Sequence, residues 1–222
     1  MSDFVNTVDS IGDEAQTNSI IDRSITEIRD NYATSIGSYA FYKCTSLTTV
    51  NFPAATIIGK SAFYSCTALI MADFPSATSI GNNAFSGCIA LKTVNFSAAT
   101  SIGEQAFFGC TALTTVNFPA ATIIDQTAFY SCTALIMADF PSATSIGNNA
   151  FNGCTKLTSL ILRSETMATL SSTGALSGTP IASGTGYIYV PSALVDSYKA
   201  ASNWSTYANQ IRAIEDYPEI CG

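Results

Sequence analysis

Hydrophobic and polar positions follow one frame through most of the chain, and that frame repeats every 22 residues. An isoleucine, a phenylalanine, a cysteine and a leucine keep fixed places in every copy. Their columns are Ile36, Ile58, Ile80, Ile102, Ile124 and Ile146; Phe41, Phe63, Phe85, Phe107, Phe129 and Phe151; Cys44, Cys66, Cys88, Cys110, Cys132 and Cys154; and Leu47, Leu69, Leu91, Leu113, Leu135 and Leu157. Self-similarity at a fixed period of about 20 to 50 residues is the signature of a solenoid. The chain is therefore predicted to be a stack of repeats.

Each copy has the form Ile-Gly-x-x-Ala-Phe-x-x-Cys-x-x-Leu-x-x-(Val/Ala)-x-Phe-Pro, which predicts one strand and one turn. In the first copy the strand covers residues 47–52, and alternation directs Val50 and Phe52 inward. Pro53 ends the strand, because a residue without an N–H cannot continue a ladder. The return leg at residues 38–41 is too short for a full helix and predicts one helical or 3₁₀ turn.

A unit of this size cannot bury its apolar side chains alone, so each strand is expected beside the strand of the next copy. This stacking predicts a repeat solenoid with a parallel sheet on one face. The glycine of the Ile-Gly pair is replaced by Asp125 in one copy. Because glycine and aspartate both tolerate positive φ, this position is expected to be left-handed.

The frame resembles the bacterial leucine-rich repeats of the BspA or Treponema pallidum type, through the elements Ile-Gly-x-x-Ala-Phe-x-x-Cys and Leu-x-x-Val-x-Phe-Pro. The resemblance covers about residues 25–162. It implies a right-handed curved stack with the parallel sheet on the concave face and short helical or 3₁₀ turns on the convex face. Since members of this family commonly bind proteins at the cell surface or outside the cell, the resemblance also implies that role. Related repeats are similar to parts of prophage-encoded surface proteins.

The two ends of the chain depart from the frame and are predicted to be caps. Residues 1–35 are expected to form an N-terminal cap with a degraded first repeat, and residues 36–162 to form six 22-residue repeats. Residues 163–222 are expected to form an atypical last repeat and a C-terminal helical cap. Within it, residues 187–191 predict a last strand, and residues 192–201 predict a helix with one apolar face that closes the core.

Composition and charge exclude several classes of function. Only 11% of the 222 residues are charged, the formal net charge is −7, and no run of Lys or Arg is present, which disfavours nucleic-acid binding. The longest uninterrupted apolar run, at residues 68–72 and again at 134–138, is too short to insert into a membrane. Residues 1–14 lack the basic and apolar regions of a secretory signal, so the chain stays inside the cell, leaves by another route or was trimmed.

The chain contains no histidine, which removes the commonest general base and the commonest zinc ligand. No Gly-rich phosphate loop occurs. Asp73 and Asp139 are three strands apart, or roughly 14 Å at about 4.8 Å per strand, too far for a glycosidase pair. We therefore expect a protein that is not an enzyme and that uses no cofactor and no metal.

The six framed cysteines allow three interpretations. Stacked copies lie within Cα distance of a disulfide, but their Cβ vectors run parallel, so a bridge would twist the coil. A straight row without histidine cannot surround a metal ion tetrahedrally. We therefore expect free, buried thiols that act as small hydrophobes.

An aromatic row at Tyr42, Tyr64, Phe108 and Tyr130 follows the core phenylalanines by one position and is expected on the convex side. Ser86 and Asn152 interrupt it. Packing between neighbouring turns is the simpler interpretation, and a sugar-stacking platform is the alternative.

The strand positions that point away from the core form two columns on the concave face. They are Thr49, Asn51, Met71, Asp73, Thr93, Asn95, Thr115, Asn117, Met137, Asp139, Ser159 and Ile161. The Asn/Asp column either consists of solvated amides bonded along the stack or offers donors and acceptors at a regular spacing to a ligand, with methionine as an adaptable contact.

Two functions remain after these exclusions. The first is a non-enzymatic module for adhesion or protein binding, which engages a protein or glycan through the concave sheet. The second is a structural spacer or tip module in a larger bacterial surface or phage assembly.

Overall fold

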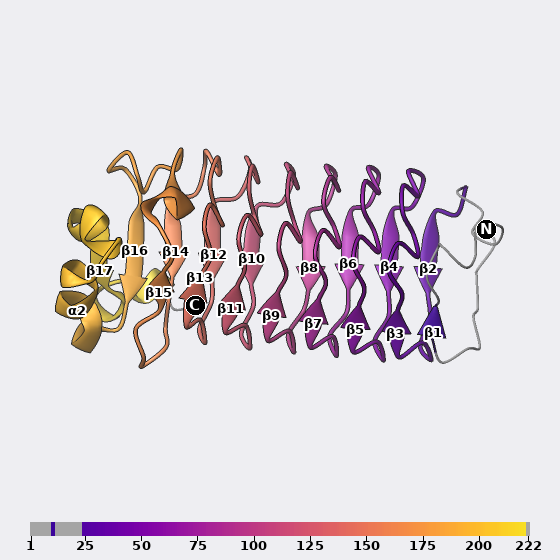
Figure 1. Cartoon of the computed structure of the whole chain (residues 1–222), viewed down its shortest axis with the longest axis horizontal. Coiled ribbons are helices and arrows are strands. Elements are labelled where there is room, and N and C mark those ends of the chain that lie inside the picture. The colour runs from indigo at the N-terminus through magenta and orange to yellow at the C-terminus, as the bar shows by residue number, and fades with distance from the viewer. Residues whose placement is uncertain (1–9, 12–23, 221–222) are drawn as a thin grey trace.

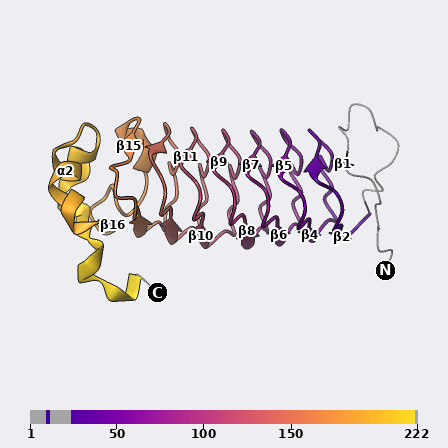
Figure 2. The same cartoon turned by 90° about the horizontal axis from the view of Figure 1, so that it is seen from below.

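The computed structural model describes residues 10–11 and 24–220 and shows an elongated stack of chain turns (Figure 1). Most of the predicted N-terminal cap, residues 1–9 and 12–23, lies outside the described residues, as do residues 221–222. Each repeat contributes one strand of three residues and one of two residues, on two sides of the stack (Figure 2). The predicted repeat solenoid is confirmed, and it carries a second parallel ladder that the sequence pattern did not predict.

The longer strands form two parallel sheets whose partners are one repeat apart, for example Val50 opposite Ala72. The first sheet contains β2 (Glu27–Arg29), β4 (Thr49–Asn51), β6 (Met71–Asp73) and β8 (Thr93–Asn95). The second contains β10 (Thr115–Asn117), β12 (Met137–Asp139), β14 (Ser159–Ile161), β16 (Tyr187–Val190) and β17 (Ile211–Ala213). Val50 and Phe52 point inward and are fully buried, as predicted. The outward side of these strands, which was expected to be concave, is called the ladder face below.

The two-residue strands form one continuous parallel sheet. It contains β1 (Ser10–Ile11), β3 (Ser35–Ile36), β5 (Ile57–Ile58), β7 (Ser79–Ile80), β9 (Ser101–Ile102), β11 (Ile123–Ile124), β13 (Ser145–Ile146) and β15 (Thr169–Leu170). A threonine precedes these strands in each repeat, and its hydroxyl donates to the main-chain oxygen of the threonine one repeat earlier. Thr78 Oγ1 donates to Thr56 O at 3.2 Å, and Thr100 Oγ1 to Thr78 O at 3.1 Å. These bonds tie neighbouring repeats together along the side of the stack.

The ladder-face sheet is interrupted between β8 and β10, although the opposite sheet is not. At neighbouring junctions the strand is flanked by main-chain bonds such as Phe74 N to Asn95 O at 2.9 Å. Within the described part of the chain, the equivalent bonds from Phe96 N and Thr114 N are absent. Val94 is only half-buried, whereas the other inward side chains of its column are buried. The repeats on either side of this junction are therefore joined by their cores and by the opposite sheet.

The core consists of aligned columns of identical side chains. The Phe107 ring stacks on Phe85 and Phe129, with centroids 5.4 and 5.2 Å away, and meets Phe96 and Phe118 nearly edge to face at 5.9 and 5.8 Å. Offset-stacked and edge-to-face pairs are the favourable arrangements for aromatic rings. Since the same packing recurs in every repeat, the phenylalanine columns form one continuous core beneath both ladder-face sheets.

The return legs are short turns closed by i to i+3 bonds, as in the predicted 3₁₀ turn, but left-handed residues such as Tyr39 interrupt them and none in the six described repeats is a helix. Cys44 N donates to Phe41 O at 3.2 Å and Tyr42 N to Tyr39 O at 3.0 Å, whereas Phe41 N reaches Ala62 O of the next repeat at 2.7 Å. N–H groups that bond within the turn thus alternate with N–H groups that bond the next repeat. Because of this alternation, no longer helix forms there.

The prediction of a left-handed residue in the Ile-Gly pair is wrong. The left-handed residues lie further along the turn, at Tyr39 with φ 60° and Lys43 with φ 56°, while Gly59 and Asp125 have no positive φ. The glycine has a different reason: a Cβ on Gly59 would lie 2.5 Å from Ser38 N. The close approach of neighbouring turns, and not the sign of φ, favours glycine there.

The C-terminal end of the core is closed by the predicted helical cap. It comprises the 3₁₀ helices Thr173–Leu176, Ser192–Leu194 and Trp204–Gln210 and the α-helix α2 (Val195–Ala200). Tyr198 and Trp204 are buried, and their polar atoms bond the main chain of Ala168, from Ala168 N to Tyr198 Oη and from Trp204 Nε1 to Ala168 O, both at 2.8 Å. Tyr207 Oη donates to Thr173 O at 2.6 Å. The cap thus covers the last core layer and satisfies main-chain groups there.

Candidate binding face

The twelve strand positions predicted to point away from the core all lie on the ladder face, and all but Ile161 reach solvent. The most open of them are Thr93, Asn95, Thr115 and Asn117, on the two strands that flank the interruption. Among these twelve positions, the ones on β8 and β10 are therefore the most accessible.

The N-terminal part of the ladder face carries a chain of hydrogen-bonded polar side chains. Asn51 Nδ2 donates to Asp73 Oδ2 at 2.9 Å, and Asn95 Nδ2 donates to Asp73 Oδ1 at 2.8 Å. Each carboxylate oxygen of Asp73 thus accepts one amide from a neighbouring repeat. Bonding along the stack, one of the two predicted roles of this column, is present here, and it orients the groups that a ligand would meet.

The chain of polar bonds stops at the interrupted junction. The residues that face each other there are Asn95 and Asn117, whereas each flanking junction of the column pairs an asparagine with an aspartate, Asp73 or Asp139. Two amides provide no carboxylate that could accept from both sides. The loss of the acidic partner and the loss of strand pairing occur at the same place.

The C-terminal part of the ladder face has an ion pair that the sequence analysis missed. Arg163 Nη2 lies 2.9 Å from Asp139 Oδ2, and Arg163 Nε lies 3.3 Å from both carboxylate oxygens. The same Nη2 donates to Ile220 O at 3.0 Å. The repeat frame does mark this residue, because Arg163 replaces the proline that stands at the same position one repeat earlier, Pro141.

Ile161 does not lie on an open surface, which corrects its assignment as a binding residue. Its side chain points away from the main core, but it is fully buried in a separate apolar cluster with Tyr189 and Ile214. Half-buried Tyr217 and Ile220 pack on this cluster, as does Met137. The covering residues come from the C-terminal segment, which was predicted only as part of a cap.

The aromatic row forms two stacked pairs. The Tyr42 and Tyr64 rings lie 5.1 Å apart with an 11° angle between planes, and Phe108 and Tyr130 lie 5.1 Å apart with 3°. The Lys43 ammonium sits 5.1 Å from the centroid of Tyr42. Because the ring faces are used on neighbouring turns, this row supports packing between repeats more than a sugar-stacking platform.

All six framed cysteines are free and buried, as predicted. Cys110 Sγ donates to Phe85 O at 3.2 Å, and Cys132 Sγ to Phe107 O at 3.1 Å, in each case to the preceding repeat. Burial raises the pKa of the Cys88 and Cys110 thiols above the ordinary value. These groups therefore remain neutral thiols and are poor nucleophiles.

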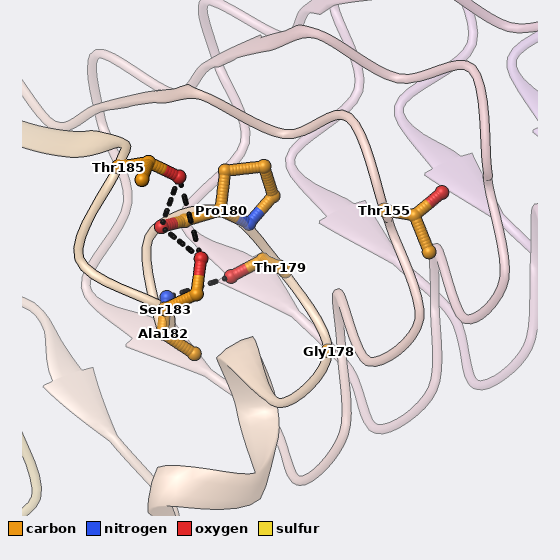
Figure 3. A pocket seen from close by; sticks show the side chains of 7 residues that line it. All are labelled: Thr155, Gly178, Thr179, Pro180, Ala182, Ser183 and Thr185. Carbon is orange, nitrogen blue, oxygen red and sulfur yellow. Dashed lines mark hydrogen bonds between the residues drawn. The ribbon is translucent and has the colours of Figure 1, made fainter.

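A shallow hollow at the C-terminal end is lined by hydroxyl side chains (Figure 3). Its Ser183 and Thr185 hydroxyls donate to Pro180 O at 3.1 and 3.3 Å, and Thr179 Oγ1 accepts from Ala182 N at 3.1 Å. These bonds hold the loop at residues 178–185 in shape. These bonds within the loop account for the shape of the hollow.

The described residues contain no group of three His, Cys, Asp or Glu side chains that could hold a metal ion. In that same part of the chain, no helix has the length and apolar character needed to cross a membrane.

The stacked parallel strands, the short turns and the capped end define a leucine-rich-repeat solenoid. The family model for the BspA type leucine rich repeat region, present in six copies, matches residues 2–99 and 78–185. The chain belongs to this family. Repeats of this family generally serve as protein-interaction modules, and homologues with this fold are typically not enzymes.

Solved structures of bacterial leucine-rich repeat proteins are similar to the chain. One from Bacteroides ovatus has 30% identity and a TM-score of 0.57, over 73% of this chain and 48% of that protein. One from Eubacterium ventriosum has 26% identity and a TM-score of 0.58, over 70% of this chain and 43% of that protein. The T. pallidum leucine-rich repeat protein shares the fold at 24% identity and a TM-score of 0.64, over 70% and 77%. The chain thus spans about half of the first protein's length. Curated protein sequences show no match to it.

Proposed function

We propose that this chain is a non-enzymatic binding module that engages a protein partner through the open, polar part of the ladder face. The observation that carries the proposal is the set of exposed outward residues on β8 and β10, next to the oriented Asn51–Asp73–Asn95 chain. Side chains held on strands over one continuous core lose little conformational entropy on binding. The family's general role in protein interaction supports this use of the face.

The partner chemistry that fits this surface is polar. Asn95 and Asn117 supply amide donors and acceptors, and Thr93 and Thr115 supply hydroxyls. A protein loop and the glycan of a glycoprotein both carry groups that hydrogen-bond to these side chains. We favour a protein partner because repeats of this family generally serve in protein interaction.

The test uses two variants of the intact chain with equal added charge. Asn95→Arg with Asn117→Arg obstructs the ladder face, whereas Ile57→Arg with Ile123→Arg changes side chains that are 53% and 47% exposed on the opposite sheet. Both variants are expected to stay within about 0.5 to 1 kcal/mol of the parent's stability, because they leave the core intact. Each protein is probed on an array of purified secreted and cell-surface proteins and on a glycan array.

We expect the parent and the opposite-sheet variant to bind the same protein on the array, and the ladder-face variant to bind it at least about tenfold more weakly, or about 1.4 kcal/mol. Binding to glycans alone would contradict the choice of a protein partner. Equal binding by all three proteins would refute the ladder face as the site, and no binding on either array would favour a structural spacer or tip module.

A further inference from the structure

The outward column of the ladder face changes its chemistry between β12 and β14. Asn51, Asp73 and Asn95 are in register on the first sheet, and Asn117, Asp139, Ile161 and Tyr189 are in register on the second. Ile161 is fully buried and Tyr189 is 5% exposed, although neither belongs to the main core. An apolar patch on the outside of a sheet requires a covering group, because exposed apolar patches are unfavourable in water.

The covering group is the chain's own residues 214–220, called the strap below. Its two 3₁₀ helices are Ile214–Asp216 and Pro218–Ile220. Ile214, Tyr217 and Ile220 are spaced by three residues, and Tyr217, with φ −133° and ψ 70°, is the bend between the two 3₁₀ turns. These three side chains pack on the patch, while Glu215, Asp216 and Glu219 remain exposed.

The strap is held by side-chain contacts and by one arginine. The Tyr217 ring meets the Tyr189 ring edge to face at 5.2 Å, and Arg163 donates to Ile220 O while it pairs with Asp139. The main-chain bonds from Tyr217 N to Ile214 O and from Ile220 N to Tyr217 O close the strap's own turns. The strap therefore docks on the sheet as a folded peptide, without extending its ladder.

We propose that the C-terminal end of the ladder face is a peptide-binding site, and that its occupant in this structure is the strap. The site recognises three apolar or aromatic side chains at a spacing of three residues, presented by two short 3₁₀ turns with a bend between them, together with one main-chain carbonyl that accepts from Arg163. The strap covers this site, so a peptide of the same chemistry must compete with it. This proposal does not depend on the outside partner proposed above.

The test separates the strap from its site. A variant that lacks residues 214–222 is titrated with a synthetic peptide of residues 214–220, acetylated and amidated so that the carbonyl of Ile220 is kept, and binding is measured by calorimetry. Far-UV circular dichroism and thermal melting check that the shortened chain folds. We expect saturable binding to the shortened chain, and binding at least about tenfold weaker to the intact chain, because a tethered segment competes at an effective concentration in the millimolar range.

A single substitution tests the site itself. In the shortened chain, Ile161→Asn restores the residue type found at this column in three earlier repeats, so it leaves the fold intact while it removes the apolar contact. It is expected to weaken peptide binding at least about tenfold, whereas the matched control Ile123→Asn, at a side chain 47% exposed on the opposite sheet, leaves binding unchanged.

The shortened chain loses the Glu215 carboxylate, which accepts from Ser192 N and Oγ, and this loss is a reason for it to fail to fold. A second variant covers that case. In the full-length chain, Tyr217→Ser with Ile220→Ser keeps Glu215 but releases the strap, and this variant should also gain peptide binding. Equal binding by the intact and strap-released proteins, no saturable binding by a folded strap-released protein up to about 1 mM, or binding unaffected by Ile161→Asn would each overturn the proposal.

Discussion

The two ends of the ladder face have the same backbone and the same core but present different surfaces. Around Asn51, Asp73 and Asn95 the outward side chains are polar and bonded to one another; Asn51 and Asp73 are half-buried and Asn95 is exposed. Around Ile161 and Tyr189 they are apolar and covered by the strap. The outward columns can therefore change from repeat to repeat without any change in the inward frame, because successive side chains of a strand point to opposite faces.

The largest expected effect tests the claim that one core supports both ends. Phe107→Ala removes a ring that contacts Phe96 and Phe118, one on each side of the interrupted junction. We expect a loss of about 3 to 5 kcal/mol in the free energy of unfolding, measured with urea, because a fully packed aromatic side chain leaves a cavity. A loss below about 1 kcal/mol would mean that the two ends do not depend on a shared phenylalanine core.

A smaller effect is expected from a pair of substitutions, one at each end of the ladder face. Arg163→Ala removes the partner of Asp139, whose side chain is only 14% exposed, and the donor to Ile220 O. Losing a charged hydrogen-bond partner there should cost about 1 to 3 kcal/mol. Asp73→Asn on the open end keeps one amide bond and should cost less than about 1 kcal/mol.

Chemical denaturation of both variants checks this difference, and amide hydrogen exchange in residues 214–220 shows whether Arg163→Ala also loosens the strap. If Asp73→Asn lowers the free energy of unfolding as much as Arg163→Ala or more, then the covered end depends on its charges no more than the open end does.

The smallest expected effect concerns the cysteine columns, which run beneath both ends. In a Cys221→Ser background, the six framed thiols should not react with a thiol probe in the native protein at pH 7 to 9, and reductant should not shift the melting temperature. Burial raises the pKa of thiols such as Cys110, so the reactive thiolate does not form as the pH rises through this range. Denaturation should expose all six. Native labelling confined to one end of the stack would show that the core is looser there.

The inward frame was readable from periodicity because every repeat carries the same local rule. The alternation within residues 47–52 directed Val50 and Phe52 to the core, and the row of identical copies required neighbours to stack. The second ladder could not be predicted in this way. Its strands, such as β3, have two residues each with one inward isoleucine, which is too short for the alternation of a strand to be recognised. The left-handed residues were also misplaced: the position of Tyr39 has no glycine in any copy, whereas the position of Lys43 is glycine in three copies, Gly87, Gly109 and Gly153, a signal that the sequence analysis did not use.

The sequence by itself determined the solenoid, the buried thiols and which side each strand residue faces, because these depend on contacts with the same position one repeat away. Only the tertiary structure decided which outward residues are available. Ile161 was predicted to face a partner, and it faces Ile214 instead, a residue far along the chain and outside the repeat frame. Periodicity specifies the side of a strand on which a residue lies, but contact with a distant segment of different sequence depends on where the cap places that segment.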